Sequence, residues 1–392
     1  MVTHIRYAYF NQIICTYFNY SIVENRSMEY CLQEKGKGCE RPKLDPFSAE
    51  VMALTRDMPK VTCDGFDWIV CKKSECYVTQ EILNNVTDIS CDYRDIIFSL
   101  FTPRWEGVKT GLRPVKTYPN PQNHGNSYNV MILAFDSSSH NGFMRKMPKS
   151  YKYLSKNAII MNGFNIVGDG TPAALFPIFT GKPEEEHPDA RKKITKNVYV
   201  DHRSFIFYKL KSFGYQTAYW EDSPHIGTFQ YRFNGFQHQP ADHYFRPFFL
   251  EHSSLPFNTP QYCTGSTPTY ELMMNISDEL FQLDGKKFCF TIIGDICHND
   301  FNQMSTADDL LLSFMESWSS RKILEDTLLV VMGDHGSRSK CENRQMTFVK
   351  SVMRQKVDDQ VLKYVNYKEE DAFFETLKCL LQKHPANTIR LR

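Results

Sequence analysis

The sequence predicts an α/β fold, an α/β/α sandwich around a mostly parallel central sheet. Apolar segments with the composition of buried strands recur at 129–135, 287–293 and 326–332. Segments with helical periodicity separate them, and this alternation is typical of a layered domain with a parallel sheet. A carboxylate follows each strand segment within a few residues, at the edge where open parallel sheets bind their ligands.

Composition limits the classes of protein and partner. A chain of 392 residues with 42% hydrophobic residues is long enough for one large domain and a smaller region. Its 46 basic and 45 acidic side chains give a net charge of +1, which argues against a nucleic-acid partner. Turn-forming residues at 118–129 mark a boundary, which predicts a Cys-rich region over 1–126 and a catalytic domain over 127–392.

Twelve cysteines are many for a cytosolic protein. A zinc module is one interpretation, but the close pair of Cys71 and Cys76 has no second pair at matching spacing. Clustering favours disulfides in an oxidising compartment, since seven cysteines fall in the first 91 residues: Cys15, Cys31, Cys39, Cys63, Cys71, Cys76 and Cys91. Sequons for glycosylation agree with secretion and start at Asn19, Asn25, Asn85 and Asn275.

We therefore expect a disulfide-containing glycoprotein that is extracellular or in the secretory pathway. In residues 1–27 Asn, Gln and Tyr interrupt the apolar residues, and no export signal is evident. No run of about 18 apolar residues predicts a membrane span, and membrane association stays open.

Two segments show clear helix boundaries. The segment 204–222 predicts a helix, a stop at Gly214 and a further strand. The segment 305–318 predicts a helix with Ser305 and Asp308 in capping-box spacing. The apolar face of this second helix consists of Leu310, Leu311, Phe314, Met315 and Trp318.

A hydroxyl residue stands at the start of another predicted helix. Thr171 follows a glycine-rich turn and precedes Pro172, and the apolar helix stops at Gly181. Capping of the helix by the hydroxyl is one interpretation. A nucleophile is the other, because the first turn of a helix has a positive dipole end and free N–H groups that hold an anion.

The strand ends carry acidic and imidazole side chains. Taken alone, Asp136 suits a turn cap, the Glu221–Asp222 pair a solvated loop, and His298 a core histidine. The full set is Asp136, Glu221, Asp222, Asp295, His298, Asp334 and His335.

Asp334 and His335 favour metal binding. They follow an apolar strand and are flanked by Gly333 and Gly336, which permit a tight turn. A carboxylate oxygen and an imidazole nitrogen are ligands that Zn²⁺ or Mn²⁺ prefers.

Five segments together resemble a poorly characterised group of animal extracellular proteins within the alkaline-phosphatase and sulfatase superfamily: 132–154, 163–181, 214–231, 242–249 and 328–338. The resemblance implies an alkaline-phosphatase-like α/β/α sandwich that binds a divalent metal, Zn²⁺ or Mn²⁺. The implied ligands are Asp136, Thr171, Asp334 and His335, with Thr171 also the nucleophile. His298 resembles the histidine that contacts substrate or a second metal in this superfamily.

The sequence departs from the sulfatase pattern at the nucleophile. Thr171 stands where sulfatases have the Cys that becomes formylglycine, and Ala173 and Leu175 replace a Pro and an Arg of their motif. Threonine resembles instead the nucleophile of the phosphodiesterase and phosphoethanolamine-transferase branches. Sulfatase chemistry is therefore disfavoured.

Two further departures concern a second metal and the carboxyl-terminal part. Asp295 and His298 are three residues apart, where two-metal phosphatases have an Asp and a His four apart, and the only histidine after Gly336 is His384. An expected apolar strand is missing after residue 336, so the catalytic domain looks shortened there.

The sequence thus predicts a metal-dependent hydrolase or transferase that acts on a phosphate ester or phosphodiester through Thr171. His298 is the predicted proton donor to the leaving group. The expected substrate is a phosphate ester of a small molecule, lipid or glycan. A secreted binding or structural protein that keeps the fold without turnover is the alternative from another class.

Overall fold

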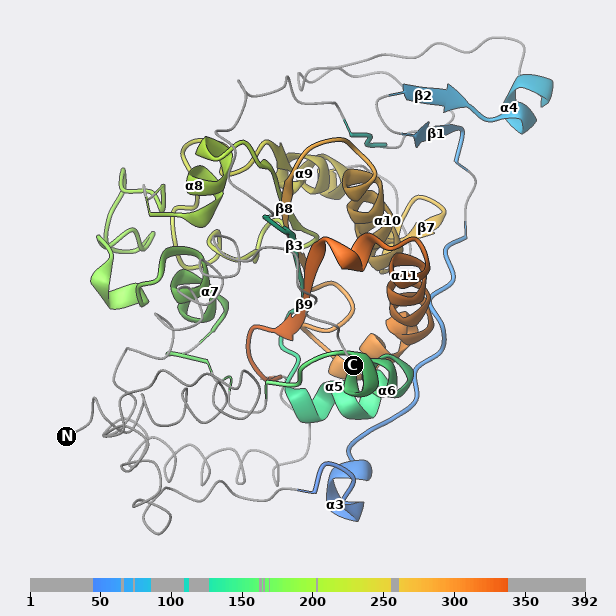
Figure 1. The fold of residues 1–392 in the computed structure, drawn as a ribbon, viewed down its shortest axis with the longest axis horizontal. Helices are drawn as coiled ribbons and strands as arrows, with labels where there is room; N and C mark the ends of the chain where they lie inside the picture. Colours follow the sequence, from blue (N-terminus) through green and yellow to red (C-terminus); the bar gives the residue numbers. More distant parts are fainter. Residues whose placement is uncertain are drawn as a thin grey trace.

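A parallel sheet of five strands forms the centre of the structure. The structure is a computed structural model that describes residues 45–64, 67–72, 75–85, 109–112, 127–161, 164, 166–168, 170–201, 204–254 and 261–337. Neighbouring strands all run parallel, in the order β5 (His243–Tyr244), β4 (Gln216–Glu221), β8 (Lys287–Ile293), β3 (Asn129–Phe135) and β9 (Thr327–Gly333). The predicted α/β fold with a mostly parallel sheet is confirmed (Figure 1).

Helices cover both faces of the sheet, as Figure 1 shows. One face carries α7 (Thr171–Thr180) and α8 (Ile206–Ser212). The other face carries α5 (His140–Lys146), α6 (Pro148–Asn157), α9 (Arg246–Ser254), α10 (Thr269–Phe281) and α11 (Asp308–Ser320). Every residue of β3 and β8 is buried, since helices on both sides exclude water, and this explains their nearly continuous apolar sequence.

The predicted strand and helix boundaries are confirmed around two glycines. The helix α8 ends at Ser212, Gly214 adopts a φ of +83°, and β4 follows. The helix α7 ends at Thr180, before Gly181 with a φ of +72°. Both glycines occupy the left-handed region that other residues rarely adopt, which is why the chain can turn there.

The helix α11 begins later than the capping-box spacing predicts. A 3-10 helix, η2, covers Phe301–Ala307, and α11 begins at Asp308. The Asp308 carboxylate accepts hydrogen bonds from the N–H groups of Lys149 and Ser150 in the first turn of α6. It therefore caps a neighbouring helix, and the capping-box interpretation is wrong. The predicted apolar face is confirmed, because Leu311, Phe314, Met315 and Trp318 are buried and Leu310 packs against the same core.

Short elements surround this sandwich. They are α3 (Ala49–Met52), β1 (Ile69–Lys72), β2 (Glu75–Val78), α4 (Gln80–Asn85), η1 (Glu184–Glu186), β6 (Cys263–Thr264), β7 (Thr267–Pro268) and η3 (Ile323–Glu325). The strands β1 and β2 form an antiparallel hairpin, and so do β6 and β7.

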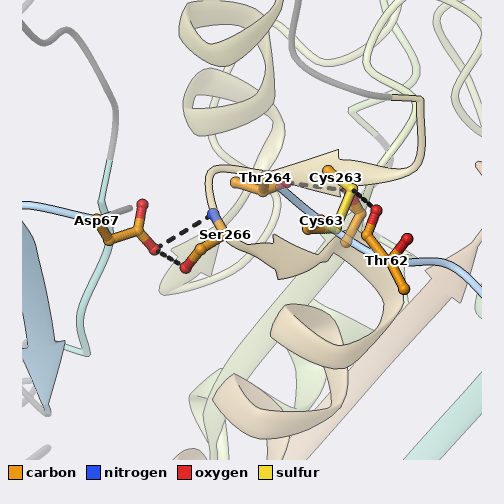
Figure 2. The surroundings of a disulfide bond; sticks show 7 residues. Thr62, Cys63, Asp67, Cys263, Thr264 and Ser266 are labelled. Atoms are coloured by element: carbon orange, nitrogen blue, oxygen red, sulfur yellow. Dashed lines mark hydrogen bonds between the residues drawn. A yellow bond between two sulfur atoms is a disulfide. The ribbon is translucent and has the colours of Figure 1, made fainter. Parts of the chain in front are cut away.

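Two disulfides confirm the prediction of disulfides for three early cysteines. Cys63 is bonded to Cys263, 200 residues later, and Cys71 is bonded to Cys76 across the β1–β2 hairpin. Figure 2 shows the first bond, beside which Asp67 accepts hydrogen bonds from the N–H and hydroxyl of Ser266. The zinc interpretation of the close pair is therefore wrong, because its two sulfurs are bonded to each other.

Several predictions lie outside the described residues. These are the fates of Cys15, Cys31, Cys39 and Cys91, the sequons at Asn19 and Asn25, and the chain after residue 337. Asn85 and Asn275 are exposed, and their glycosylation stays a prediction, as does the domain boundary at residue 126. Within the described ranges, the helices are too short or too polar to span a bilayer.

Candidate metal centre

The register of the sheet brings three strand ends to one level. Phe135, the last residue of β3, pairs with Gly333 of β9 on one side and with Ile293 of β8 on the other. Asp136 continues β3, and its N–H donates to the carbonyl of Ile293 over 2.9 Å. The side chains that follow these three strands therefore meet at the carboxyl edge of the sheet, where such sheets bind ligands.

Gly333 permits a close approach at this edge. A Cβ atom on Gly333 would lie 1.8 Å from the carbonyl oxygen of Ser138, so any other residue would force the two strand ends apart. Neither Gly333 nor Gly336 has a positive φ. The chain bends at Asp334 and His335, as expected, and the glycine at 333 is needed for space rather than for a left-handed φ.

Asp136, Asp334 and His335 form a three-residue group in which one possible ligand atom of each lies within 4.8 Å of the others. His335 Nε2 is 3.4 Å from Asp334 Oδ2 and 3.8 Å from Asp136 Oδ1. These side chains are largely buried, with exposed fractions of 8% for His335, 11% for Asp136 and 0% for Asp334. In the part of the chain that the structure describes, this is the one group of that kind.

The His335 ring has the orientation expected of a metal ligand. Its Nδ1 lies 2.9 Å from the carbonyl oxygen of Gly336, which can only accept, so Nδ1 carries the hydrogen. The other ring nitrogen, Nε2, faces the two carboxylates. A histidine that binds a metal commonly donates its other ring N–H to a carbonyl in this way.

Thr171 joins the group from the helix α7. Gly170, with a φ of 102°, precedes the helix, and Thr171 is its first residue. The Thr171 hydroxyl lies 3.3 Å from His335 Nε2. No backbone N–H of a described residue donates to this hydroxyl, so the capping interpretation of Thr171 is wrong.

The two carboxylates are crowded, and Asp334 is incompletely satisfied. Burial raises the pKa of Asp136 well above its usual value, and the nearby charge of Asp334 raises it further. One oxygen of Asp334 accepts from the N–H groups of Ser137 and His335, both over 2.8 Å. Its other oxygen, Oδ2, is buried and has no hydrogen-bond partner among the described residues. Because a buried carboxylate oxygen without a hydrogen-bond donor is costly, a cation at this point would stabilise the arrangement.

Ser137 is a residue that the sequence analysis left without a role. Its N–H donates to Asp334, and its hydroxyl donates to Asp136 Oδ1 over 3.0 Å. Its φ of 60° is unusual for a residue other than glycine. The one signal in the sequence is its place directly after the strand-end Asp136.

Glu221 and Asp222 are buried, so the interpretation as a solvated loop is wrong. Asp222 accepts hydrogen bonds from the N–H groups of Gly294 and Asp295, and burial raises its pKa to about 6. Glu221 accepts from the N–H and hydroxyl of Thr228, and burial raises its pKa to about 7.

His298 lies apart from the three-residue group. It follows β8, its N–H donates to the carbonyl of Gly294 over 2.8 Å, and its ring Nδ1 is 3.0 Å from Asn299 Oδ1. Burial, and then the charge of Asp222, raise the pKa of the neighbouring Asp295 to about 7. Among the described residues, Asp295 and His298 complete no second three-ligand group.

Comparisons with known proteins give a family and two distant structures. A family model described as "Protein of unknown function (DUF229)" matches residues 45–375. No curated protein sequence matches the chain. One similar structure is the lipoteichoic acid synthase LtaP from Listeria monocytogenes, with 15% identity and a TM-score of 0.35 over 59% of this chain and 62% of that one. Another is Ps i-CgsB in complex with k-i-k-neocarrahexaose, with 14% identity and a TM-score of 0.35 over 55% and 61% of the two chains. The chain thus covers less than two thirds of either protein.

Proposed function

The chain belongs to the DUF229 family of proteins of unknown function, and from this premise we propose that it is a metal-dependent hydrolase or transferase of phosphate esters or phosphodiesters. Thr171 is the proposed nucleophile. Asp136, Asp334, His335 and Thr171 are the proposed ligands of a divalent cation, Zn²⁺ or Mn²⁺. Since the function of the family is unknown, the proposal depends on the chemistry of the site.

One observation supports the proposal above the others. The Thr171 hydroxyl lies 3.3 Å from a histidine nitrogen that also faces two buried carboxylates. A helix cap or a packing contact does not require this combination. The Asp334 Oδ2 without a hydrogen-bond donor and the His335 Nε2, which lies 3.4 Å from it and 3.3 Å from the Thr171 hydroxyl, form a set of oxygen and nitrogen ligands that fits a divalent cation.

A bound divalent cation supplies Lewis acidity, which lowers the pKa of a coordinated hydroxyl and offsets negative charge on phosphoryl oxygens. The side chain of Thr171 loses its hydroxyl proton to solvent and attacks phosphorus, and the bond to the leaving alcohol breaks. His298 is the proposed donor of the proton that the leaving oxygen takes up. Water or an acceptor hydroxyl then attacks the phosphothreonine and restores Thr171.

The start of α7 supports this reaction electrostatically. The first N–H groups of a helix have no partner within the helix, and Pro172 carries no N–H. The N–H groups of Thr171 and Ala173 are therefore the donors in this turn that can hold the phosphoryl oxygens. The positive end of the ten-residue helix favours the same negative charge.

The disulfides support a location in an oxidising compartment, and we propose an extracellular or secretory protein. Thiol alkylation of the native chain tests this proposal. Cys63, Cys71, Cys76 and Cys263 should react only after reduction, and reaction of these cysteines without a reductant would contradict it.

Substitution of Thr171 tests the function. The chain with added Mn²⁺ or Zn²⁺ should hydrolyse bis(p-nitrophenyl) phosphate. Thr171→Ala should lower kcat by ~10³-fold or more, because no other group can form the covalent intermediate. Thr171→Ser should retain part of the activity, since it keeps a hydroxyl.

Thr269→Ala is the matched control. Thr269 is also the first residue of a helix, α10, and its hydroxyl bonds to Thr264 rather than to the metal ligands. This variant should keep full turnover. Unchanged turnover in a folded Thr171→Ala protein would remove Thr171 from the mechanism. A parent chain without turnover on phosphate esters would favour the binding-protein alternative.

A further inference from the structure

Asp222 ties the ends of two strands together. Its Oδ1 accepts from the N–H of Gly294 over 2.9 Å and from the hydroxyl of Ser223 over 3.1 Å. Its Oδ2 accepts from the N–H groups of Gly294 and Asp295, each over 3.1 Å. The side chain thus continues the hydrogen bonding between β4 and β8 beyond the point where the two strands end.

The turn held by Asp222 also contacts the backbone of Asp136. The carbonyl of Ile293, directly before Gly294, accepts the N–H of Asp136 over 2.9 Å. A Cβ on Gly294 would lie 3.3 Å from Asp222 Oδ1 and 3.6 Å from Asp136 Cβ. Gly294 is therefore packed between the two carboxylate side chains, and a shift of this turn moves the backbone of Asp136.

We propose that Asp222 is a positioning residue for the metal centre, which acts by holding the Gly294–Asp295 turn against β4 and so fixes Asp136. This inference rests on the proposed function, since it takes Asp136 as a metal ligand. Asp222 has its oxygens satisfied by backbone and hydroxyl donors, so it does not itself need a cation. Groups that orient a metal ligand through hydrogen bonds affect metal affinity strongly without touching the metal.

Glu221 offers a matched control one residue away. It is also a buried carboxylate at the end of β4, and it too accepts a backbone N–H and a hydroxyl, both from Thr228. These hydrogen bonds stay within the segment after β4 and do not reach β8. Glu221→Gln therefore removes a comparable buried charge without releasing the turn at Gly294.

The experiment measures Mn²⁺ binding to the full-length chain and to Asp222→Ala, Asp222→Asn and Glu221→Gln. Asp222→Ala should weaken Mn²⁺ binding by about 10-fold or more and alter the EPR spectrum of the bound ion. Asp222→Asn keeps one acceptor oxygen and should restore part of the affinity. Glu221→Gln should bind Mn²⁺ as the parent does.

A second measurement needs no metal. Hydrogen exchange of a peptide over residues 290–298 should become faster in metal-free Asp222→Ala and stay slow in Glu221→Gln. Unchanged Mn²⁺ affinity or unchanged exchange in folded Asp222→Ala would overturn the inference and leave the proposed function standing. Failure of the parent to bind Mn²⁺ would overturn both. A parent that binds Mn²⁺ but has no turnover would refute the proposed function and leave this inference standing.

Discussion

Replacement of Glu221 by Gln should change how the stability of the protein depends on pH. Glu221 is buried at the end of β4, with one oxygen bonded to Thr228 and the other, Oε1, without a hydrogen-bond partner among the described residues. Gly227 lies against the same carboxylate, since a Cβ there would be 2.5 Å from Oε2. The side chain therefore has no room to turn toward water, and burial raises its pKa from 4.5 to about 7.

The sign and size of the effect follow from linkage. Because the folded state holds the proton more tightly than the unfolded state, Glu221 destabilises the fold as the pH rises from 4.5 through 7. A rise of the Glu221 pKa from 4.5 to about 7 corresponds to about 3 kcal/mol. The free energy of unfolding falls by this amount once the pH exceeds the pKa of the folded state. Glu221→Gln cannot ionise, so it escapes this loss.

Urea unfolding of the parent and the variant between pH 4.5 and 8.5 provides the assay. Each sample contains EDTA, so that metal binding does not contribute. Between pH 4.5 and 8.5 the free energy of unfolding of the variant should rise by about 3 kcal/mol relative to that of the parent, whatever the difference between them at pH 4.5. Carboxylates that do not interact with Glu221 titrate in both proteins and cancel in the difference, whereas the neighbouring Asp222 also raises the pKa of Glu221 and is part of the effect. Parallel stability curves would show that Glu221 ionises normally in the folded protein and would refute the reasoning.

Two further substitutions test the strand ends and the disulfides. Gly333→Ala should cost about 1–3 kcal/mol of stability by chemical denaturation and weaken Mn²⁺ binding, because its Cβ would lie 1.8 Å from the Ser138 carbonyl oxygen. Gly336→Ala, whose nearest new contact is 3.4 Å, should be nearly silent, and equal effects would contradict the steric argument. Cys63→Ser should lower the free energy of unfolding by about 5 kcal/mol, because the disulfide that it removes spans 200 residues. Cys71→Ser should cost about 2 kcal/mol, because its disulfide spans 5 residues, and the reverse order would refute the loop-closure account.

The sheet was predictable because its signal is local. The segments 129–135 and 287–293 match β3 and β8 residue for residue, since burial on both faces demands an apolar side chain at nearly every position. Once strand ends are known, parallel register brings the residues that follow them to one edge. The structure accordingly brings Asp136, Asp334 and His335 together, while their role as ligands stays a prediction.

Two other contacts between segments far apart in the chain were not predictable. Asp308 has the spacing of a capping box with Ser305, yet it caps α6 by accepting from the N–H of Ser150, 158 residues away in sequence. Gly333 has the neighbours of a turn residue, yet it makes room for the Ser138 carbonyl. In both cases the local pattern is correct for the residue type, and a partner brought in by the fold decides its use.

The same distinction separates the strand-end carboxylates, which look alike in sequence. Asp222 has both oxygens occupied by backbone N–H donors, so the protein itself provides the partners that this carboxylate needs. Glu221 accepts the N–H and hydroxyl of Thr228 on one oxygen, and its other oxygen, Oε1, has no donor, which agrees with the rise of its pKa to about 7 on burial. Asp334 accepts both of its N–H donors on Oδ1, and its Oδ2 is buried without a hydrogen bond, 3.4 Å from His335 Nε2. An acceptor without a donor suits a cation where a second carboxylate and a histidine nitrogen lie beside it, and among the described residues this holds at Asp334 and not at Glu221. The hydrogen bonds at each oxygen therefore support the proposed metal site at Asp334 and the proposed positioning role of Asp222.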